Sequence, residues 1–311
     1  MCALAVRTEN LTKRFGDVTA LDGLDLEVQQ GEVFGFLGPN GAGKTTTIRL
    51  LLDLIRPTAG AAWVMGVPAT DVRRAHRHVA YVPGEASLWP QLTGAETLTL
   101  LGNVSGADPV LRDELVERLQ LDPSLRVRAY SRGNRQKIML VAALMTRADL
   151  LLMDEPTAGL DPLMEAEFQA LVREAAGRGQ TVFLSSHLLD EVEDVCHRVA
   201  ILRAGRLVEV ATLDELRKLG SLILDAEFDG PVPDPADLLL LSGVVSVEPH
   251  AGGVRVVVSG SPAALLAAFA AAGVARLHSH EPTLEEVFLG YYETSKGQRS
   301  AMAAAHDRSR P

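Results

Sequence analysis

The chain contains the stretch Gly38-Pro39-Asn40-Gly41-Ala42-Gly43-Lys44-Thr45-Thr46, which fits the phosphate-loop pattern G-x-x-x-x-G-K-[ST]. The apolar run Val33–Leu37 before it is typical of a buried strand, and Thr47–Leu52 after it is typical of a helix. Glycines allow successive backbone N–H groups of such a loop to face phosphate oxygens, and the N-terminus of the following helix adds a favourable dipole. We therefore expect this stretch to hold the phosphates of a nucleotide.

Two side chains of this stretch and two acidic side chains farther along the chain have separate predicted roles. Lys44 would neutralise charge on the β- and γ-phosphates, and the Thr45 hydroxyl would bind Mg²⁺. Asp154 and Glu155 end the apolar run Leu150–Met153, and neighbouring residues of an extended chain point to opposite faces. Asp154 can therefore hold Mg²⁺ while Glu155 polarises a water molecule. Alone, these carboxylates could equally begin a solvated loop, but a phosphate loop in the same chain favours the chemical interpretation.

The overall composition narrows the class of protein. The 311 residues leave room for one large and one smaller domain, each with its own core. The formal net charge of -10 provides no basic surface, so we expect no nucleic-acid partner. Cys2 and Cys196 lack metal-ligand spacing, which argues against a disulfide scaffold or a zinc site and suits a reducing cytoplasm. No run approaches the roughly 18 apolar residues of a membrane span, and the N-terminus lacks signal-peptide features.

The larger predicted domain covers residues 1–219. Short β-rich runs alternate there with helical segments, which predicts an α/β fold around a mostly parallel sheet. Val6–Leu11 and Leu24–Val28 are expected to form an antiparallel edge. Residues 94–145 are expected to form a helical insertion.

The smaller predicted domain covers residues 220–293 and has α+β character. Its strand-like and helical runs follow one another as β-α-β-β-α-β, which is close to a ferredoxin-like split unit. Residues 294–311 mix Ser, Lys, Arg and Ala without a lasting apolar period. We predict a disordered tail there.

Further motifs follow in order along the larger domain. They are Phe15, the signature segment Tyr130-Ser131-Arg132-Gly133-Asn134-Arg135-Gln136-Lys137, the loop Pro156-Thr157-Ala158-Gly159-Leu160-Asp161-Pro162, and His187 after Ser185-Ser186. With the phosphate loop and Asp154-Glu155, they resemble the ATP-binding subunits of ABC transporters over about residues 4–219. The resemblance implies a P-loop NTPase cassette with a mostly parallel sheet, an antiparallel β edge and a helical subdomain. It also implies ATP and Mg²⁺ as cofactors.

The resemblance implies roles for single residues as well. His187 would touch the γ-phosphate, Glu155 would position or deprotonate the attacking water, and Phe15 would stack on adenine, where the family more often has Tyr. Phenylalanine keeps the ring face and loses only a hydroxyl. Without the other motifs, a lone His after a strand would be structural and Phe15 would be a core aromatic.

Ser131 and Gly133 would serve a second subunit. The resemblance implies that their segment meets the nucleotide of another cassette, with the N-terminus of the helix through Ile138–Met145 facing the γ-phosphate. Asp161 is assigned to the same nucleotide-binding set, and the partner cassette is expected to be a second copy of this chain. Ser131 is also a plausible N-cap of that helix, which is compatible with the first role.

The chain departs from the family pattern at two places. Family members commonly show Leu-Ser-Gly-Gly-Gln in the signature, so Tyr130, Arg132 and Asn134 differ, and Arg132 would add attraction to phosphate. The family usually has Gln at the position of Gly84, which has no side chain to reach Mg²⁺ or water. Either Glu85 replaces the missing amide, or backbone or water does.

The motifs point to a separate motor subunit. The chain has one set of motifs, no long heptad-bearing insertion and no membrane span, so its expected partner is a separately encoded membrane permease. The chain would then lie at the cytoplasmic face of the cell membrane. Glu281–Leu289 looks like the tail of daunorubicin-resistance-type export subunits, which favours export of a drug, antibiotic or lipid-like substrate. That tail is equally a core-docking helix by its spacing.

Other interpretations remain open at this point. A soluble ABC ATPase that remodels a cytosolic partner, or the motor of another ABC transport class, would carry the same motifs. A small-molecule kinase would leave Ser131, Asp161 and His187 without a role. If the chain drives a permease, Leu88 and Trp89 are candidate contacts, although Trp89 could equally fill a core.

Overall fold

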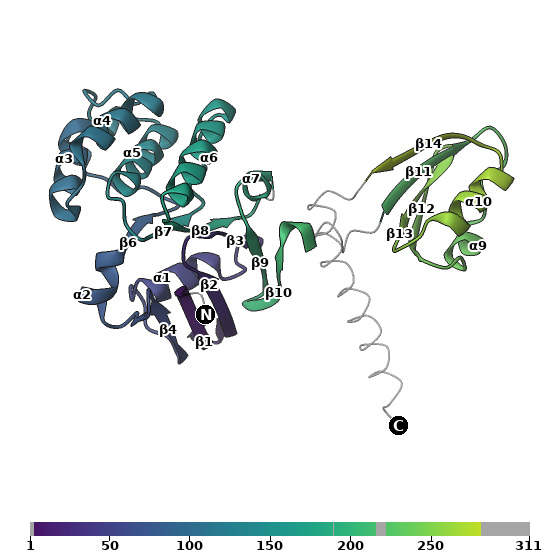
Figure 1. Ribbon diagram of the computed structural model, residues 1–311, viewed down its shortest axis with the longest axis horizontal. Helices are drawn as coiled ribbons and strands as arrows, with labels where there is room; N and C mark the ends of the chain where they lie inside the picture. Colours follow the sequence, from purple (N-terminus) through teal and green to yellow (C-terminus); the bar gives the residue numbers. More distant parts are fainter. Residues whose placement is uncertain (1–2, 189, 216–221, 281–311) are drawn as a thin grey trace. The chain divides into compact units, whose positions relative to one another are not determined.

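A six-stranded sheet forms the centre of the N-terminal part of the chain (Figure 1). The computed structural model describes residues 3–188, 190–215 and 222–280, and the chain divides between Thr212 and Leu213 into a first and a second unit. The sheet has the strand order β10-β9-β3-β8-β7-β6. Its members are β3 (Val33–Leu37), β6 (Val79–Val82), β7 (Leu150–Asp154), β8 (Thr181–Ser186), β9 (Arg198–Arg203) and β10 (Arg206–Thr212). Neighbouring strands are parallel except for β10, which is antiparallel to β9.

The central strands are completely buried, as their apolar runs predicted. Every residue of β3, β7 and β8 is buried, which is typical of parallel strands covered on both faces. Because these strands are parallel, β3, β6, β7 and β8 end at the same edge, where ligands bind in open sheets of this type. The phosphate loop, Gly84, Glu155 and His187 each follow one of these strand ends. The topology therefore gathers motifs from four distant stretches of sequence.

A second, four-stranded sheet confirms the predicted antiparallel edge. It has the order β2-β1-β4-β5. Its strands are β1 (Leu4–Phe15), β2 (Val18–Gln29), β4 (Ala59–Val64) and β5 (Val67–Pro68). One core joins this sheet to the central sheet and to α1 (Lys44–Leu51). In that core Phe34 and Phe36 pack on Phe183 with ring centroids 5.9 and 5.2 Å apart, and burial of each ring contributes about 1.5–3 kcal/mol.

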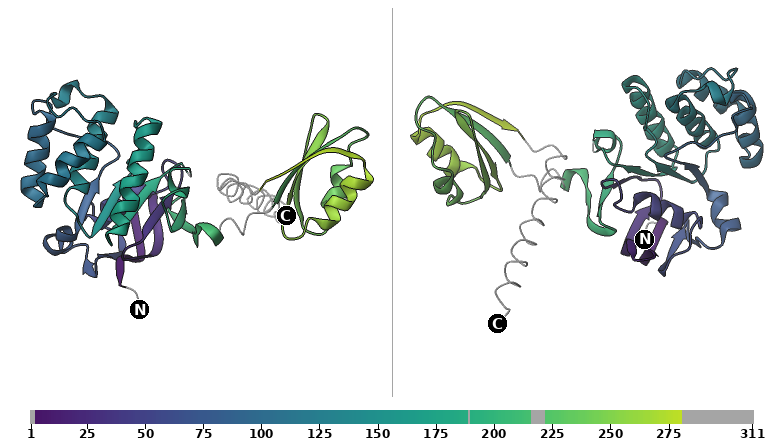
Figure 2. Two further views of the ribbon diagram at one scale, coloured as in Figure 1. Left: turned by 45° about the horizontal axis from the view of Figure 1, so that its top comes forward. Right: turned by 180° about the vertical axis from the view of Figure 1, so that it is seen from behind.

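The helical insertion is present and is grouped on one side of the first unit in Figure 1 and in each view of Figure 2. It contains α3 (Gly94–Ser105), α4 (Pro109–Arg118), the 3₁₀ helix η2 (Val127–Ala129) and α5 (Arg132–Leu144). α3 starts at a capping box formed by Thr93 and Glu96, and α4 starts with Pro109 after the cap Asp108. The remaining helices of this unit are α2 (Val72–Ala75), η1 (His76–His78), α6 (Pro162–Gly177) and α7 (Asp190–Glu193).

The second unit is an α+β layer with its own core. Its elements are β11 (Leu222–Phe228), α9 (Pro235–Leu239), β12 (Val244–His250), β13 (Gly253–Val258), α10 (Ala263–Ala271) and β14 (Val274–His280). They follow the expected order β-α-β-β-α-β and form an antiparallel sheet of order β12-β13-β11-β14. Val254, Val256, Leu265 and Phe269 are buried together between the sheet and its helices. Figure 2 shows α9 and α10 on one face of this sheet.

Some of the predictions fall outside the described residues. The proposed export-type segment Glu281–Leu289 and the proposed tail at residues 294–311 both do, and the predicted domain boundary at residue 219 lies in the gap between 215 and 222. Across the parts of the chain that the structure describes, helices are too short or too polar to cross a membrane.

Candidate functional site

The phosphate loop connects β3 to α1 and encloses its own lysine. Lys44 is the first residue of α1 and its side chain is only 5% exposed. Its Nζ donates to the backbone oxygen of Gly38 at 2.5 Å, so the ammonium folds back over the start of the loop. The same Nζ lies 3.1 Å from Oε1 of Glu155. Along the rest of the loop, Asn40 and Gly41 are exposed, Gly38, Ala42 and Gly43 are buried, and Pro39, Thr45 and Thr46 are half-buried.

Asp154 and Glu155 lie in different environments, as expected. The alternation of side chains along a strand is not the cause, which corrects the reason given by the sequence. Asp154 is the last residue of β7, is 3% exposed, and accepts a hydrogen bond of 2.6 Å from Ser185 Oγ on the neighbouring strand. Glu155 has already left the strand, with a φ of 48°. A left-handed backbone costs a non-glycine residue about 1–2 kcal/mol, and the bond from Glu155 N to Ser185 O (3.0 Å) holds it there. The left-handed turn, and not the pleat of a strand, therefore separates the two carboxylates.

Glu155 lies between the lysine of the phosphate loop and the histidine after β8. His187 Nδ1 is 2.6 Å from Glu155 Oε2. A carboxylate only accepts hydrogen bonds, so the ring carries its proton on Nδ1 in this contact. The other oxygen, Oε1, is buried and accepts no hydrogen bond, although the Lys44 ammonium is 3.1 Å away. A carboxylate oxygen that is held by an ion pair and accepts no geometric hydrogen bond keeps the capacity to accept a proton from water.

The two predicted magnesium ligands, Thr45 after β3 and Asp154 at the end of β7, have the donor chemistry that Mg²⁺ prefers. The Thr45 hydroxyl and the Asp154 carboxylate are hard oxygen donors, and Mg²⁺ is commonly bound through one or two protein oxygens plus substrate phosphates and water. Within the described residues, no cluster of three His, Cys, Asp or Glu side chains forms a metal cage. Phosphate oxygens would therefore complete the coordination shell.

Phe15 is not a core residue. It ends β1, is 50% exposed, and pairs with Val18 across the turn of the hairpin. The ammonium of Lys13 lies 4.8 Å from the centroid of its ring and also donates to the backbone oxygen of Arg56 at 2.7 Å. The exposed ring of Phe15 is compatible with stacking on a base. Its contact with adenine stays a prediction.

The signature segment packs against the loop that follows Glu155. Ser131 is exposed and its Oγ accepts from the backbone N–H of Asn134 at 3.1 Å, so it is the N-cap of α5. Gly133 is buried, and a Cβ there would collide with the backbone oxygen of Gly159. Asp161, farther along the same loop, caps α6 by accepting from Met164 N at 3.1 Å. Among the described residues no hydrogen bond joins the signature segment to the phosphate loop of the same chain.

Gly84 lies directly against the carboxylate pair. A Cβ on Gly84 would be 3.2 Å from the backbone oxygen of Asp154 and 3.7 Å from Cβ of Glu155. Gln136, which is 2% exposed on α5, donates from Nε2 to the backbone oxygen of Pro83 at 3.2 Å. No sequence motif indicates this contact or the hydrogen bond from Ser185 to Asp154. The pairing of β7 with β8 sets Ser185 opposite Asp154, which the sequence alone does not show.

Two other titratable groups in this unit are held neutral by their surroundings. Burial, and then the carboxylate of Asp154, raises the pKa of Tyr81 to about 12. Burial, and then Glu32, raises the pKa of the Cys196 thiol far above its usual range. Cys196 is therefore an unreactive buried side chain, as expected from the sequence.

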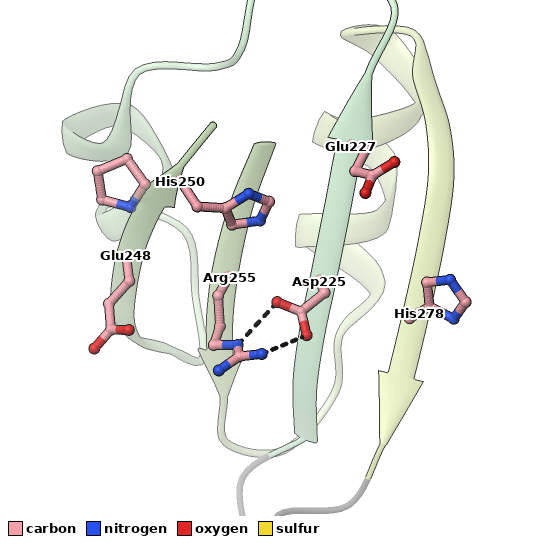
Figure 3. Close-up of a pocket in the computed structure, with 7 residues that line it drawn as sticks. Asp225, Glu227, Glu248, His250, Arg255 and His278 are labelled. Atoms are coloured by element: carbon pink, nitrogen blue, oxygen red, sulfur yellow. Dashed lines mark hydrogen bonds and ion pairs between the residues drawn. The ribbon is translucent and has the colours of Figure 1, made fainter. Parts of the chain in front are cut away.

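A shallow hollow of about 430 Å³ lies on the second unit (Figure 3). Its lining comes from all four strands of that sheet: Asp225, Glu227, Glu248, Pro249, His250, Arg255 and His278. Arg255 forms a bidentate ion pair with Asp225, at 2.9 and 3.0 Å. None of the nucleotide motifs belongs to this unit.

Comparison with known proteins gives a consistent result. A protein-family model described as ABC transporter matches residues 21–158. Over 224 residues the chain is 41% identical to the daunorubicin resistance ATP-binding protein DrrA3 of Streptomyces coeruleorubidus, a match that covers 70% of this chain and 71% of that protein. Over 293 residues it is 33% identical to the Nod factor export ATP-binding protein I of Cupriavidus metallidurans, covering 91% of this chain and 96% of the relative.

A solved structure supports the fold. It is a dimeric ATP-binding cassette in a post-hydrolysis state with ADP and Pi. The TM-score is 0.61 at 23% identity, and the match covers 67% of this chain and 98% of that chain. At this identity the likeness concerns the fold of the first unit alone.

Proposed function

The chain belongs to the family of ABC transporter ATP-binding proteins, and we propose from this that it is the motor subunit of an exporter and drives a separate membrane permease. It binds ATP and hydrolyses it, as this family does. The observation that best supports a working hydrolytic site is the position of Glu155 between Lys44 and His187 at the edge of the parallel sheet.

We assign the steps of phosphoryl transfer to residues of this edge. Such transfer asks a protein mainly for positioning and for stabilisation of negative charge. The N–H groups of the phosphate loop and the Lys44 ammonium hold the β- and γ-phosphates. Thr45 and Asp154 hold Mg²⁺, which supplies further positive charge to the phosphate oxygens when bound. Glu155 takes a proton from the attacking water, and His187 holds the γ-phosphate.

The second half of the site comes from another cassette in this proposal. Ser131 and the N-terminus of α5 are exposed and make no hydrogen bond to the phosphate loop of their own chain among the described residues. The similar cassette of known structure is a dimer bound to ADP and Pi, which supports a dimeric site. Two copies of this chain would clasp ATP head to tail, and hydrolysis would release them.

Export of a drug, an antibiotic or a lipid-like molecule is the transport direction we propose. The relatives are named for daunorubicin resistance and for Nod factor export, which supports this direction. The subunit would lie at the cytoplasmic face of the membrane as a peripheral component. A soluble ATPase acting on a cytosolic partner is the alternative, and recovery of a membrane permease with this chain distinguishes the two.

Trp89 supplies a test of the permease contact. It is 48% exposed in the loop after Gly84, so it does not fill a core. Replacing Trp89 with Ala is expected to reduce recovery of the permease from detergent-solubilised membranes by roughly tenfold or more, because an interface Trp commonly contributes on the order of 2 kcal/mol. ATP hydrolysis by the isolated subunit should be unchanged.

Leu54→Ala is the matched control for this experiment. Leu54 is 60% exposed and follows α1, away from the loop 84–90 in sequence. It should leave permease recovery at the wild-type level. Equal recovery with the Trp89 and wild-type chains would remove Trp89 from the contact, and recovery of no permease at all would favour the soluble alternative.

The same preparations test whether Glu85 replaces the glutamine that the family usually has at the position of Gly84. Its side chain is exposed, whereas the backbone of Gly84 packs on Asp154. We therefore expect Glu85→Ala to keep permease-coupled ATP hydrolysis within about twofold of the wild type, as for other surface carboxylates. A tenfold loss of coupled hydrolysis, with basal hydrolysis retained, would instead assign the role of the missing glutamine to Glu85.

A further inference from the structure

Glu191 bridges two buried hydroxyl groups of the candidate site. Thr157 Oγ1 donates to one oxygen of its carboxylate and Ser186 Oγ donates to the other. Thr157 is 4% exposed and Ser186 is fully buried. A carboxylate can accept two such bonds at once, and bonds to an ionised acceptor are roughly twice as strong as neutral ones.

Thr157 lies in the loop that follows Glu155, and Ser186 is the last residue of β8, directly before His187. Ser186 is also tied to the phosphate loop, because its backbone oxygen accepts from Gly38 N at 3.4 Å. One side chain therefore connects the loop after β7 with the end of β8, at the residue that also contacts the phosphate loop.

The backbone that carries Glu191 is itself fixed. Its neighbour Val192 on α7 is 1% exposed and packs on Gly35 of β3, where a Cβ would collide with the Val192 side chain. Ser186 Oγ also accepts from Leu188 N at 2.9 Å, a contact that spans His187. The bridge therefore has a rigid support on both sides.

The same two segments of chain are joined a second time, by the contact between His187 and Glu155. That contact is more accessible, since His187 is 44% exposed. It must break when His187 turns to a γ-phosphate and Glu155 turns to a water molecule. The bridge through Glu191 involves neither reacting group and can persist throughout.

We propose that Glu191 is a positioning residue, whose bridge between Thr157 and Ser186 keeps Glu155 and His187 at a constant separation while their own contact opens and closes. This inference rests on the proposed roles of Glu155 and His187. Misplacement of reacting groups by about 1 Å can cost on the order of 100-fold in rate, so a residue that sets their separation affects turnover more than nucleotide binding.

The test compares Glu191→Ala with Glu191→Gln. Glutamine can hydrogen-bond both hydroxyls, since each accepts as well as donates. We expect the alanine variant to lower kcat by about 10- to 100-fold with KM for ATP within about threefold, and the glutamine variant to recover most of the loss. Asp194→Asn, an exposed carboxylate without a bond to either segment in the described structure, should match the wild type.

Removal of the hydroxyls provides a second measurement if the alanine variant does not fold. Thr157→Val and Ser186→Ala each break one end of the bridge, so their combination should cost little more than either alone. Additive losses would overturn the proposal, and so would an unchanged kcat in Glu191→Ala or equal losses in Glu191→Ala and Glu191→Gln.

Hydrogen exchange separates this inference from the assignment of the reacting groups. Without nucleotide, the amides of residues 155–161 and 186–188 should exchange faster in Glu191→Ala than in the wild type. That readout does not depend on hydrolysis. Unchanged exchange would refute the bridge even if Glu155 proves to be the base, whereas faster exchange would support it even if Glu155 does not.

Discussion

Replacing Glu155 with Gln is expected to lower ATP turnover by about 100-fold or more, because a general base contributes on the order of 10²–10⁴-fold. The amide has nearly the same shape and can keep its contacts with Lys44 and His187. It cannot accept a proton at neutral pH. ATP binding should therefore persist, and the variant should accumulate as an ATP-bound dimer of this chain.

Two measurements check this result. Phosphate release gives the turnover number, and size-exclusion chromatography with light scattering gives the mass with ATP and Mg²⁺ present. Glu117→Gln on α4 is the matched control, an exposed carboxylate outside the site, and should give the turnover number and the mass of the wild type. A turnover number of Glu155→Gln close to that of the wild type would contradict the assignment of Glu155 as the general base. A trapped species in which Ser131 lies far from every nucleotide would contradict the head-to-tail dimer.

Replacing Lys44 with Met is expected to weaken ATP binding by about 100-fold or more, because charge-assisted bonds from a buried ammonium to phosphate are among the strongest polar contacts. Lys44 is 5% exposed, so little water would replace the lost charge. Titration calorimetry with ATP and Mg²⁺ measures the change. Retention of wild-type affinity would remove Lys44 from the phosphate site.

The same variant has a second, nucleotide-independent effect. Lys44 is the positive group beside the buried Oε1 of Glu155, and that oxygen accepts no hydrogen bond. Loss of the lysine leaves a partly buried carboxylate without its charge partner, which destabilises the folded chain. The Tm of Lys44→Met without nucleotide should therefore be lower than that of the wild type. Adding Glu155→Gln to Lys44→Met should recover part of the loss, since the unpaired charge is then removed.

The sequence was sufficient for the fold of the first unit because local and global signals agree there. Apolar runs of strand length before the phosphate loop and before Asp154-Glu155 predicted β3 and β7, and their alternation with helical segments predicted a mostly parallel sheet. The order of elements in the second unit was likewise readable, since three prolines and two Ala-rich or Leu-rich helical runs separate its strands. These are features of neighbouring residues, which a linear pattern records.

The sequence was less informative about the local geometry of the site. It predicted that Asp154 and Glu155 would diverge by strand alternation, but Glu155 leaves the strand in a left-handed turn. Its spacing also gave no sign that Gly84 packs on Asp154 or that Gln136 binds Pro83. These contacts join residues between about 50 and 70 positions apart, and each depends on how the loop after β6 is held by a helix or a strand that is distant in sequence.

The amino-acid sequence by itself determined the chemistry of this protein: a loop of glycines with Lys44, an acidic strand end, and a histidine after the next buried strand. Only the tertiary structure decided that Glu155 lies between Lys44 and His187, and that Glu191 joins the segments on which Glu155 and His187 lie. The reason is physical. Side-chain identity and strand period are local properties, whereas the distance between two strand ends is set by sheet pairing and by buried hydrogen bonds between distant residues.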